Sequence, residues 1–396
     1  MSIELQHLHT LVEQVSEEVI DWRRYLHQNP ELSFEEENTS QFVFDTLSSF
    51  GGLEISRPTK TSVMARLKGA HPGAVLAIRA DMDALPITEE NTFEFASSEP
   101  GKMHACGHDG HTAMLLGTAK ILSQMSDSIH GEVRFIFQHA EELFPGGAQQ
   151  MVDAGVMEGV DEVIGIHLIS LIPVGKVVVK SGPFMAAPDT FHITIRGKGG
   201  HAAQPNQCVD PLVIGAQVVV NLQHIVSRNV DPLDPLVVSV TQFHAGTATN
   251  IIPDTVELAG TVRSFKAELR VEVPQLMERI VKGVTEAHDA TYEFSYQRGY
   301  RPVINDESVT EKVRKALVEI FGEETVVEGK PVMGAEDFSA YQSVVPGTFF
   351  NVGAGNVDKG ITYPHHHPKF TVDEDALPVG VESFVGIVLK TMGESV

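Results

Sequence analysis

Apolar residues recur at helical spacing near the start of the chain, and this pattern predicts a long amphipathic helix within the first 28 residues. The positions that carry the repeat are Leu8, Leu11, Val15, Val19 and Trp22. The pattern stops at Asn29-Pro30, because a proline ends a helix. Ser33 and Glu36 have the spacing of a capping box, so we expect a second helix that starts there and ends at Gly51-Gly52.

Short runs rich in β-branched and aromatic residues follow, and helical patterns alternate with them. The predicted strands cover residues 63–67, 75–78, 133–137, 163–167, 174–179 and 348–352. The predicted helices among them cover residues 112–121, 148–153, 308–321 and 373–392. This alternation is typical of an α/β domain with a mostly parallel central sheet.

The middle of the chain has a different order of elements. It reads as a strand, a helix, two strands, a helix and a strand, over residues 190–195, 211–226, 236–243, 256–262, 267–288 and 291–296. The order β-α-β-β-α-β is typical of a ferredoxin-like α+β unit. We therefore predict an α/β domain in two parts, 1–185 and 299–396, interrupted by an inserted domain over 186–298.

Composition narrows the class of protein. The 396 residues are 42% hydrophobic and 21% charged, which is typical of a globular protein and excludes a disordered chain, a coiled coil and a small disulfide scaffold. The formal net charge is −24. Such a surface repels nucleic acid and anionic membranes, so we expect neither as a partner.

The cysteines and the apolar stretches indicate the cellular compartment of the protein. The two cysteines, Cys106 and Cys208, lie far apart, which suits a reducing compartment better than a disulfide framework. The first residues lack the basic segment and apolar run of a signal peptide. Every apolar stretch is far shorter than the roughly 20 residues of a membrane span. We therefore expect a cytoplasmic protein.

Histidines gather at two places in the sequence, and one group surrounds a cysteine. Within Met103–His111, Cys106 and His108 are two residues apart, with Gly107 between them to permit an irregular backbone. Thiolate and imidazole both bind borderline-soft divalent ions, so this segment predicts a metal site. The alternative is a catalytic Cys106 nucleophile activated by His108.

Further candidate ligands follow predicted strands. The strand 133–137 leads into Glu141 and Glu142, and the strand 163–167 ends in His167. Ligand sites of open α/β sheets lie at the carboxyl ends of strands, where one carboxylate can bind metal while another carries a proton. A solvated acidic loop and a core histidine are the alternatives. We expect at least one ligand among His365–His367, which lie between two prolines.

Two aspartates follow the strand 75–78. Asp81 and Asp83 are two residues apart, so both side chains point to the same side of an extended chain. They could bind metal directly, or they could hold the imidazole of a ligand histidine by a hydrogen bond. A solvated turn is the alternative.

Seven segments in this order resemble one family, the aminoacylase/hippuricase/auxin-conjugate amidohydrolases within the carboxypeptidase-and-aminoacylase class of metallopeptidases. They span almost the whole chain and are His27–Leu32, Arg79–Pro86, Met103–His111, His139–Glu142, Gly199–Pro205, Gly334–Phe338 and His366–Pro368. The resemblance implies a catalytic domain with two metal ions and an inserted lid or dimerisation domain.

The resemblance also implies roles for particular residues. The metal ligands would be Cys106, His108, Glu142, His167 and His366. Glu141 would be the general base and then the general acid. His201 would help to hold the oxyanion, in its own subunit or in a neighbour's, and Asn250 and Arg263 would contact substrate.

One departure from the wider class concerns the early strand. Most of its peptidases have a metal-binding histidine where this chain has Asp81, and the resemblance implies that His108 and Cys106 replace the missing donors. The role of Asp81 and the identity of the metal therefore stay open. The resemblance implies two divalent ions, with Mn or Zn favoured over Co or Ni.

The predicted activity is hydrolysis of N-acyl amino acids to a carboxylic acid and a free amino acid. We also expect a homodimer that forms through the inserted domain. Water activated by the metals would attack the amide, with Glu141 moving the proton. The first alternative is a dipeptidase or carboxypeptidase of the same class. The second is a non-catalytic metal-binding protein on this fold.

Overall fold

The computed structural model describes residues 5–393 and divides them into two compact units. Within the described residues, the first unit comprises the chain up to Phe184, Ile304–Pro331, and the chain from Asp337 onward. The second unit comprises Met185–Val303 and Val332–Glu336. Each unit has its own hydrophobic core, so each is a packed domain in the physical sense.

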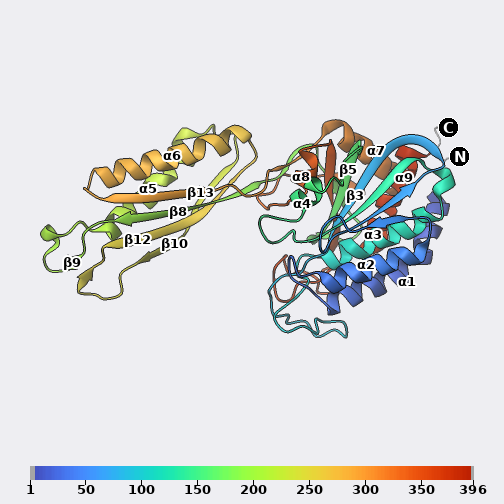
Figure 1. The fold of residues 1–396 in the computed structure, drawn as a ribbon, viewed down its shortest axis with the longest axis horizontal. Coiled ribbons are helices and arrows are strands. Elements are labelled where there is room, and N and C mark those ends of the chain that lie inside the picture. Colours follow the sequence, from blue (N-terminus) through green and yellow to red (C-terminus); the bar gives the residue numbers. More distant parts are fainter. Residues whose placement is uncertain (1–4, 394–396) are drawn as a thin grey trace. The chain divides into compact units, whose positions relative to one another are not determined.

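An eight-stranded sheet forms the centre of the first unit, in the order β1-β2-β4-β3-β5-β16-β6-β15 (Figure 1). Its strands are β1 Glu54–Ser56, β2 Val63–Lys68, β3 His71–Asp81, β4 His130–Gln138, β5 Glu162–Pro173, β6 Val177–Val179, β15 Val326–Glu328 and β16 Gly347–Gly355. The central pairs β4/β3, β3/β5 and β5/β16 are parallel. The mostly parallel sheet predicted from the sequence is confirmed.

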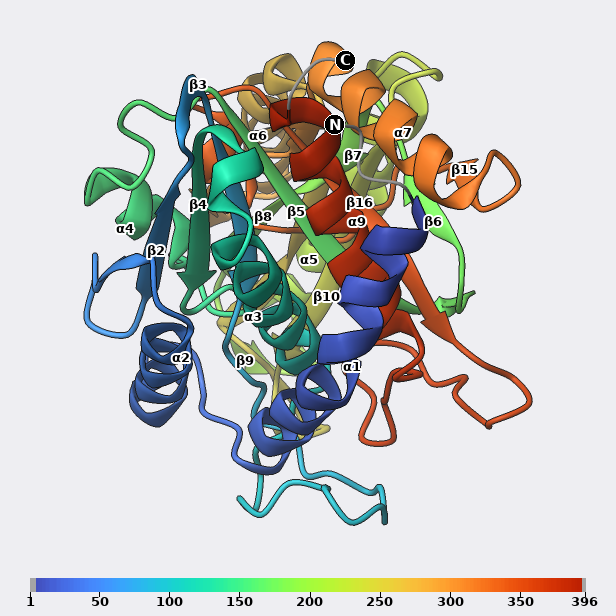
Figure 2. The same cartoon turned by 90° about the vertical axis from the view of Figure 1, so that its right-hand side faces the viewer.

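Long helices cover one face of this sheet. The helices of the unit are α1 Leu5–Gln28, α2 Glu37–Phe50, α3 His108–Ser123, α4 Ala148–Asp153, α7 Glu307–Phe321, α8 Ser339–Gln342 and α9 Ala376–Met392. Helices α1, α3 and α9 pack on one another in front of the strands (Figure 2). Neighbouring residues of β16 face opposite ways: Phe350 meets Phe384 of α9, whereas Phe349 meets Phe338 beside α8.

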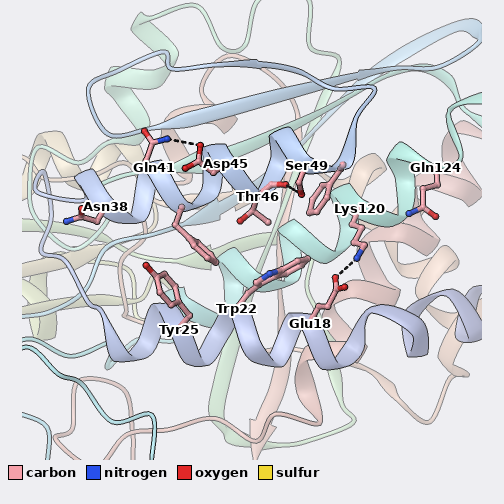
Figure 3. Close-up of a pocket in the computed structure, with 12 residues that line it drawn as sticks. Glu18, Trp22, Tyr25, Asn38, Gln41, Asp45, Thr46, Ser49, Lys120 and Gln124 are labelled. Atoms are coloured by element: carbon pink, nitrogen blue, oxygen red, sulfur yellow. Dashed lines mark hydrogen bonds and ion pairs between the residues drawn. The ribbon is translucent and has the colours of Figure 1, made fainter.

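A groove of about 890 Å³ lies between α1, α2 and the end of α3 (Figure 3). Its aromatic wall includes Trp22, Tyr25 and Phe42, and its polar side chains pair with one another, as Glu18 does with Lys120. No histidine or cysteine lines it, so it offers no ligands for a soft metal ion.

The second unit contains a four-stranded antiparallel sheet in the order β10-β12-β8-β13. Its main elements follow the predicted order, as β8 Ala187–Arg196, α5 Pro211–His224, β10 Leu236–Ala245, β12 Thr255–Ser264, α6 Ala267–Glu286 and β13 Thr291–Gln297. Four short strands form two further two-stranded sheets, β11 with β9 and β14 with β7: β7 Gly182–Met185, β9 Gly200–His201, β11 Ile251–Ile252 and β14 Val303–Asn305. Helices α5 and α6 pack on this sheet through a core that includes Val218 and Val273.

Two local predictions are wrong. Helix α2 has no capping box, because Ser33 Oγ donates to Asp83 Oδ2 at 2.6 Å and the Glu36 carboxylate accepts from the backbone of Phe34 and Ala140. Strand β5 does not end at His167 but continues to Pro173, paired with β16. In both cases contacts between residues that are distant in sequence determine the local structure.

Among residues 5–393, every helix is too short or too polar to cross a membrane.

Candidate metal centre and active site

The structure brings all five predicted metal ligands together in the first unit. Cys106 and His108 lie at the start of α3, His167 lies on β5, Glu142 follows β4, and His366 lies in the loop after β16. Their ligand atoms form overlapping groups within 4.8 Å: Cys106–His108–His167, Cys106–Glu142–His366, and His108–Glu141–Glu142. The predicted base, Glu141, therefore shares the cluster.

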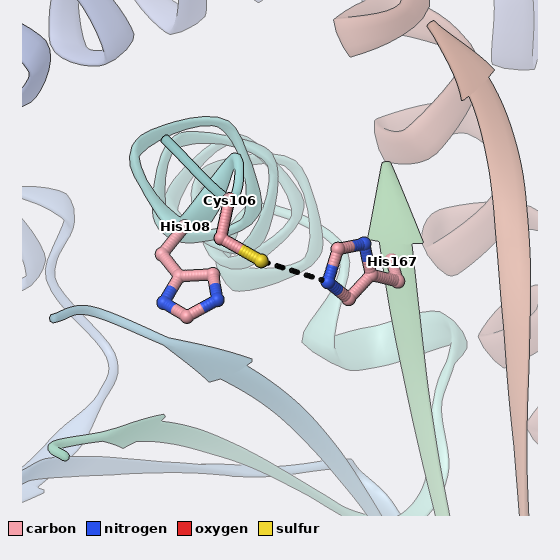
Figure 4. Close-up of side chains that lie close together, drawn as sticks. All are labelled: Cys106, His108 and His167. Carbon is pink, nitrogen blue, oxygen red and sulfur yellow. Dashed lines mark hydrogen bonds between the residues drawn. The ribbon is translucent and has the colours of Figure 1, made fainter. Parts of the chain in front are cut away.

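Individual distances show how the segments meet. Cys106 Sγ lies 3.5 Å from His167 Nε2 (Figure 4). Glu142 Oε1 lies 3.1 Å from His366 Nε2 and 4.0 Å from His108 Nε2. Strands β3, β4 and β5 are parallel, so the segments that follow β3 and β4 lie at one edge of the sheet, beside His167.

Backbone geometry at this edge depends on glycine. Gly107 has φ +96°, a left-handed conformation that separates Cys106 from the first residue of α3. A Cβ atom on Gly110 would lie 2.5 Å from Leu168 Cδ1, so the Leu168 side chain would have to shift to accept a larger residue there. His366 and Ala140 also have positive φ, at 65° and 49°, in the loops that carry the ligands.

Two buried donor atoms in the cluster fit a cation. His108 Nε2 is among the few buried side-chain atoms of the described residues that have no hydrogen-bond partner, and Glu142 Oε1 is buried in contact with His366 Nε2 at 3.1 Å. An unsatisfied buried polar atom is costly, and a metal ion bound to its lone pair removes that cost. The mixed set of thiolate, imidazole and carboxylate donors suits a borderline-soft divalent ion.

The electrostatics of the cluster also favour positive charge. Burial opposes an imidazolium at His108, but Asp81, Asp83 and Glu142 outweigh it and raise the pKa of His108 to about 10. Burial, followed by Glu142 and Glu141, raises the pKa of the Cys106 thiol well above its usual value. A cation bound beside the thiol would counter this effect, because a metal-bound thiol is deprotonated.

Asp83 joins two of the ligand segments. Its Oδ1 lies 3.2 Å from His108 Nδ1, and its backbone carbonyl lies 2.9 Å from the same nitrogen. Its Oδ2 accepts from the backbone N–H of Glu142 at 3.0 Å. Asp83 therefore fixes the ring of His108 and directs Nε2 into the cluster.

Asp81 is enclosed by other side chains. Its Oδ2 accepts from Arg79 Nη1 at 2.7 Å, and its Oδ1 lies 2.6 Å from His111 Nδ1. Burial disfavours the charged carboxylate, but the Arg79 guanidinium and the neighbouring histidines hold its pKa well below its usual value. Asp81 therefore contacts the cluster in two ways. Its Oδ1 contacts His111, and its Oδ2 lies 3.6 Å from His108 Nε2.

The predicted residues of the inserted domain lie in the second unit. The backbone N–H of Ala202, next to His201, donates to the Asn250 carbonyl at 3.0 Å, and His201 is exposed on β9. His201 lies near the Thr255 end of β12, because it pairs with Ile251, whereas Arg263 lies eight residues beyond Thr255, which is about 26 Å at roughly 3.3 Å per residue. One small substrate therefore cannot touch both Arg263 and His201 within one second unit.

Two histidines beside the cluster, His111 and His365, received no individual role from the sequence. His111 Nε2 accepts from the Leu168 backbone N–H at 2.9 Å, and His365 Nε2 lies 2.9 Å from the Leu168 carbonyl. His111 lies one helical turn after His108, a spacing that could have indicated a shared face of α3. The contact of His365 with β5 has no signal in the local sequence.

A cluster of thiol, imidazole and carboxylate groups at the carboxyl edge of a mostly parallel sheet is typical of metal-dependent hydrolases. The family described as peptidase family M20/M25/M40 matches residues 77–390, and the chain belongs to this family. The family-level resemblance seen in the sequence is confirmed.

Three similar proteins illustrate the family. An N-acyl-L-amino acid amidohydrolase of Geobacillus stearothermophilus is 70% identical over 295 residues, which cover 74% of this chain and 80% of that protein. Thermostable carboxypeptidase 2 of Saccharolobus solfataricus is 44% identical, with 96% of each chain covered. A Bacillus subtilis crystal structure described as a dinuclear metal binding peptidase has a TM-score of 0.84 and 38% identity, and covers 96% of this chain and 99% of that one.

Proposed function

We propose that this protein is a metal-dependent amidohydrolase that cleaves N-acyl amino acids to a carboxylic acid and a free amino acid. The observation that carries the proposal is the donor cluster, in which His108 Nε2 has no hydrogen-bond partner and Glu141 and Glu142 lie beside it. The relative at 70% identity, named an N-acyl-L-amino acid amidohydrolase, supports this substrate class.

The residues that would hold two divalent ions are Cys106, His108, Glu142, His167 and His366. When bound, such ions supply Lewis acidity toward the acyl carbonyl and toward water. The description of the Bacillus subtilis relative as a dinuclear protein supports the number of ions. We propose Mn or Zn as the metal, with Co or Ni as the alternatives.

Glu141 carries the proton in this proposal. It is buried and lies in one donor group with Glu142 and His108, next to the site where the amide must sit. Its carboxylate takes a proton from water as the water oxygen adds to the acyl carbon, and it then gives that proton to the leaving amine nitrogen. No acyl-enzyme forms, so no serine or cysteine nucleophile is needed.

Two residues of the second unit would complete the site. His201 would donate to the oxyanion, and the Arg263 guanidinium would pair with the substrate carboxylate, which simple amides lack. If Arg263→Ala leaves the Michaelis constant for an N-acyl amino acid unchanged, the proposed role of Arg263 is wrong. Asn250 remains a proposed substrate contact.

A homodimer through the second unit is part of the proposal. Helix α5 exposes Leu212, Val213 and Val220 at 40%, 51% and 64%, and β10 is an edge strand of its sheet. Exposed apolar side chains beside an unpaired edge strand favour association with a second copy. The separation of Arg263 from His201 favours an arrangement in which these residues serve sites of different copies. A cytoplasmic location stays a prediction.

A substrate panel tests the proposal. Metal-free protein is supplied separately with Mn²⁺, Zn²⁺, Co²⁺ or Ni²⁺ and assayed on N-acetyl and N-benzoyl amino acids and on free dipeptides. We expect metal-dependent release of amino acid from the N-acyl substrates. Faster hydrolysis of peptides would favour the carboxypeptidase alternative, which the Saccharolobus relative supports. No hydrolysis by the metal-loaded protein would overturn the proposal.

A further inference from the structure

The backbone of one residue, Leu168, contacts three histidine rings. Its N–H donates to His111 Nε2 at 2.9 Å. Its carbonyl oxygen lies 2.8 Å from His167 Nδ1 and 2.9 Å from His365 Nε2. The rings of His111 and His365 also lie against that of His167, with centroids 4.6 Å and 5.2 Å apart.

These contacts fix which nitrogen of each ring carries a proton. A backbone N–H can only donate, so His111 Nε2 is an acceptor and His111 Nδ1 carries the proton toward Asp81. A carbonyl can only accept, so His167 Nδ1 and His365 Nε2 both donate. The remaining nitrogen of His167, Nε2, therefore keeps its lone pair, and it is the atom 3.5 Å from Cys106 Sγ.

A chain of charged groups supports His111 from the other side. Asp81 accepts from His111 Nδ1 and from Arg79 Nη1, and Arg79 Nη2 donates to Asp337 Oδ1 at 3.0 Å. These side chains are fully buried or nearly so. Buried charges that are paired this completely have little freedom to move, so the position of His111 is rigid.

We infer that His111 and His365 are positioning residues that hold the Leu168 backbone and so present the lone pair of His167 Nε2 to a metal ion. The inference rests on the proposed function only for the identity of His167 as a ligand. It assigns no metal-binding role to His111, although its ligand atom lies within 4.8 Å of those of Asp81 and His108. Both of its nitrogens are already used, by Leu168 and by Asp81.

Pairs of variants separate the two contacts of each ring. A glutamine amide lies where Nε2 lies and an asparagine amide lies nearer to Nδ1, so His111→Gln keeps an acceptor for the Leu168 N–H while His111→Asn keeps a donor for Asp81. At the second ring, His365→Gln keeps a donor for the Leu168 carbonyl and His365→Asn loses it. Metal-free protein is titrated with Co²⁺ alone, and the thiolate-to-cobalt absorption from Cys106 reports the affinity of the ion next to His167.

We expect His111→Asn and His365→Asn to weaken this Co²⁺ affinity by about 10- to 100-fold, as is typical when support of a ligand is lost, and both glutamine variants to stay within about 3-fold of the wild type. Equal effects of glutamine and asparagine at both rings would overturn the inference, and so would loss of one bound ion in every His111 variant. Thermal melting of the metal-free variants checks their folding. If His111→Asn does not fold, the comparison of His365→Gln with His365→Asn tests the inference. Failure of the wild type to bind Co²⁺ would overturn the proposed function as well. Normal Co²⁺ results without hydrolysis would overturn the proposed function alone.

Discussion

Glu142 Oε1 lies 3.1 Å from His366 Nε2, and this contact joins the loop after β4 to the loop that follows β16. The two residues are far apart in sequence, and each lies in a loop with a residue of positive φ, His366 itself and Ala140 before Glu142. Such geometry is retained where the surrounding structure imposes it, commonly at functional sites. Both side chains are therefore held beside Cys106, where a shared ion would satisfy them.

Two variants of Cys106 can show whether this residue is a metal ligand or a nucleophile. We expect Cys106→Asp to keep part of the hydrolytic activity, because a carboxylate can still bind a divalent ion, whereas Cys106→Ala loses bound metal and activity together. The measurements are metal content by mass spectrometry and release of free amino acid. A nucleophilic cysteine would instead leave both variants inactive with full metal content.

His201 can be tested for action across a dimer. We expect His201→Ala and Glu141→Gln to be nearly inactive alone and to regain activity when they are mixed and allowed to exchange subunits. A mixed dimer then contains one complete site, so recovery reaches about a quarter of the wild-type rate if exchange is statistical. A mixture that stays inactive despite demonstrated subunit exchange would show that His201 does not act in a neighbour.

Glu36 makes the stability of the metal-free protein depend on pH. Burial, followed by Asp83, raises the pKa of the Glu36 carboxyl from 4.5 to about 7. Between these values the unfolded chain loses the proton and the folded chain keeps it, so this group lowers stability as pH rises from 4.5 to 7, by up to about 3 kcal/mol.

The variant Glu36→Gln removes this titration while its amide still offers an acceptor to the Ala140 N–H. We expect it to be more stable than the wild type at pH 8, by about 1–3 kcal/mol, with little gain at pH 4.5. Urea unfolding of metal-free protein at both pH values measures the difference. Glu37→Gln, at an exposed neighbour, is the control, and an equal gain at both positions would contradict the assignment.

Gly165 lies on β5 two residues before His167, and aromatic rings pack directly on it. A Cβ atom there would lie 2.8 Å from the Phe349 ring and 3.1 Å from Phe338 Cε2. Because rigid buried rings cannot yield easily, Gly165→Ala should lower stability by about 1–3 kcal/mol. Gly283→Ala is the control, since no atom lies within 4 Å of a Cβ atom in that position on α6. Calorimetric melting that ranks the two variants in the reverse order would contradict this packing.

The order of elements could be predicted from local signals, whereas the full set of ligands was implied by the resemblance to a known family. Apolar periodicity defines α1 and α3, and the segment Met103–His111 places a thiol and an imidazole at the start of one helix. Because β3, β4 and β5 are parallel, donors at the carboxyl ends of the predicted strands were expected close together, and Glu142 and His167 do lie close together although β5 continues past His167.

Interactions between distant segments could not be predicted. Ser33 and Glu36 have the spacing of a helix cap, yet Asp83 and Ala140 offer them better-buried partners. Strand β5 extends beyond His167 because β16 pairs with it as far as Pro173. The contact of His365 with Leu168 depends on how the loop after β16 folds back, and the sequence pattern holds no signal for that.

We propose that Glu141 moves the proton while neighbouring side chains hold the metal. The most direct measurement compares the turnover of an N-acyl amino acid by wild type and Glu141→Gln, with the bound metal of each counted in the same samples. We predict full metal content and a loss of about 10²- to 10⁴-fold in turnover for the variant. Turnover near the wild-type value with metal bound would show that Glu141 does not carry the proton.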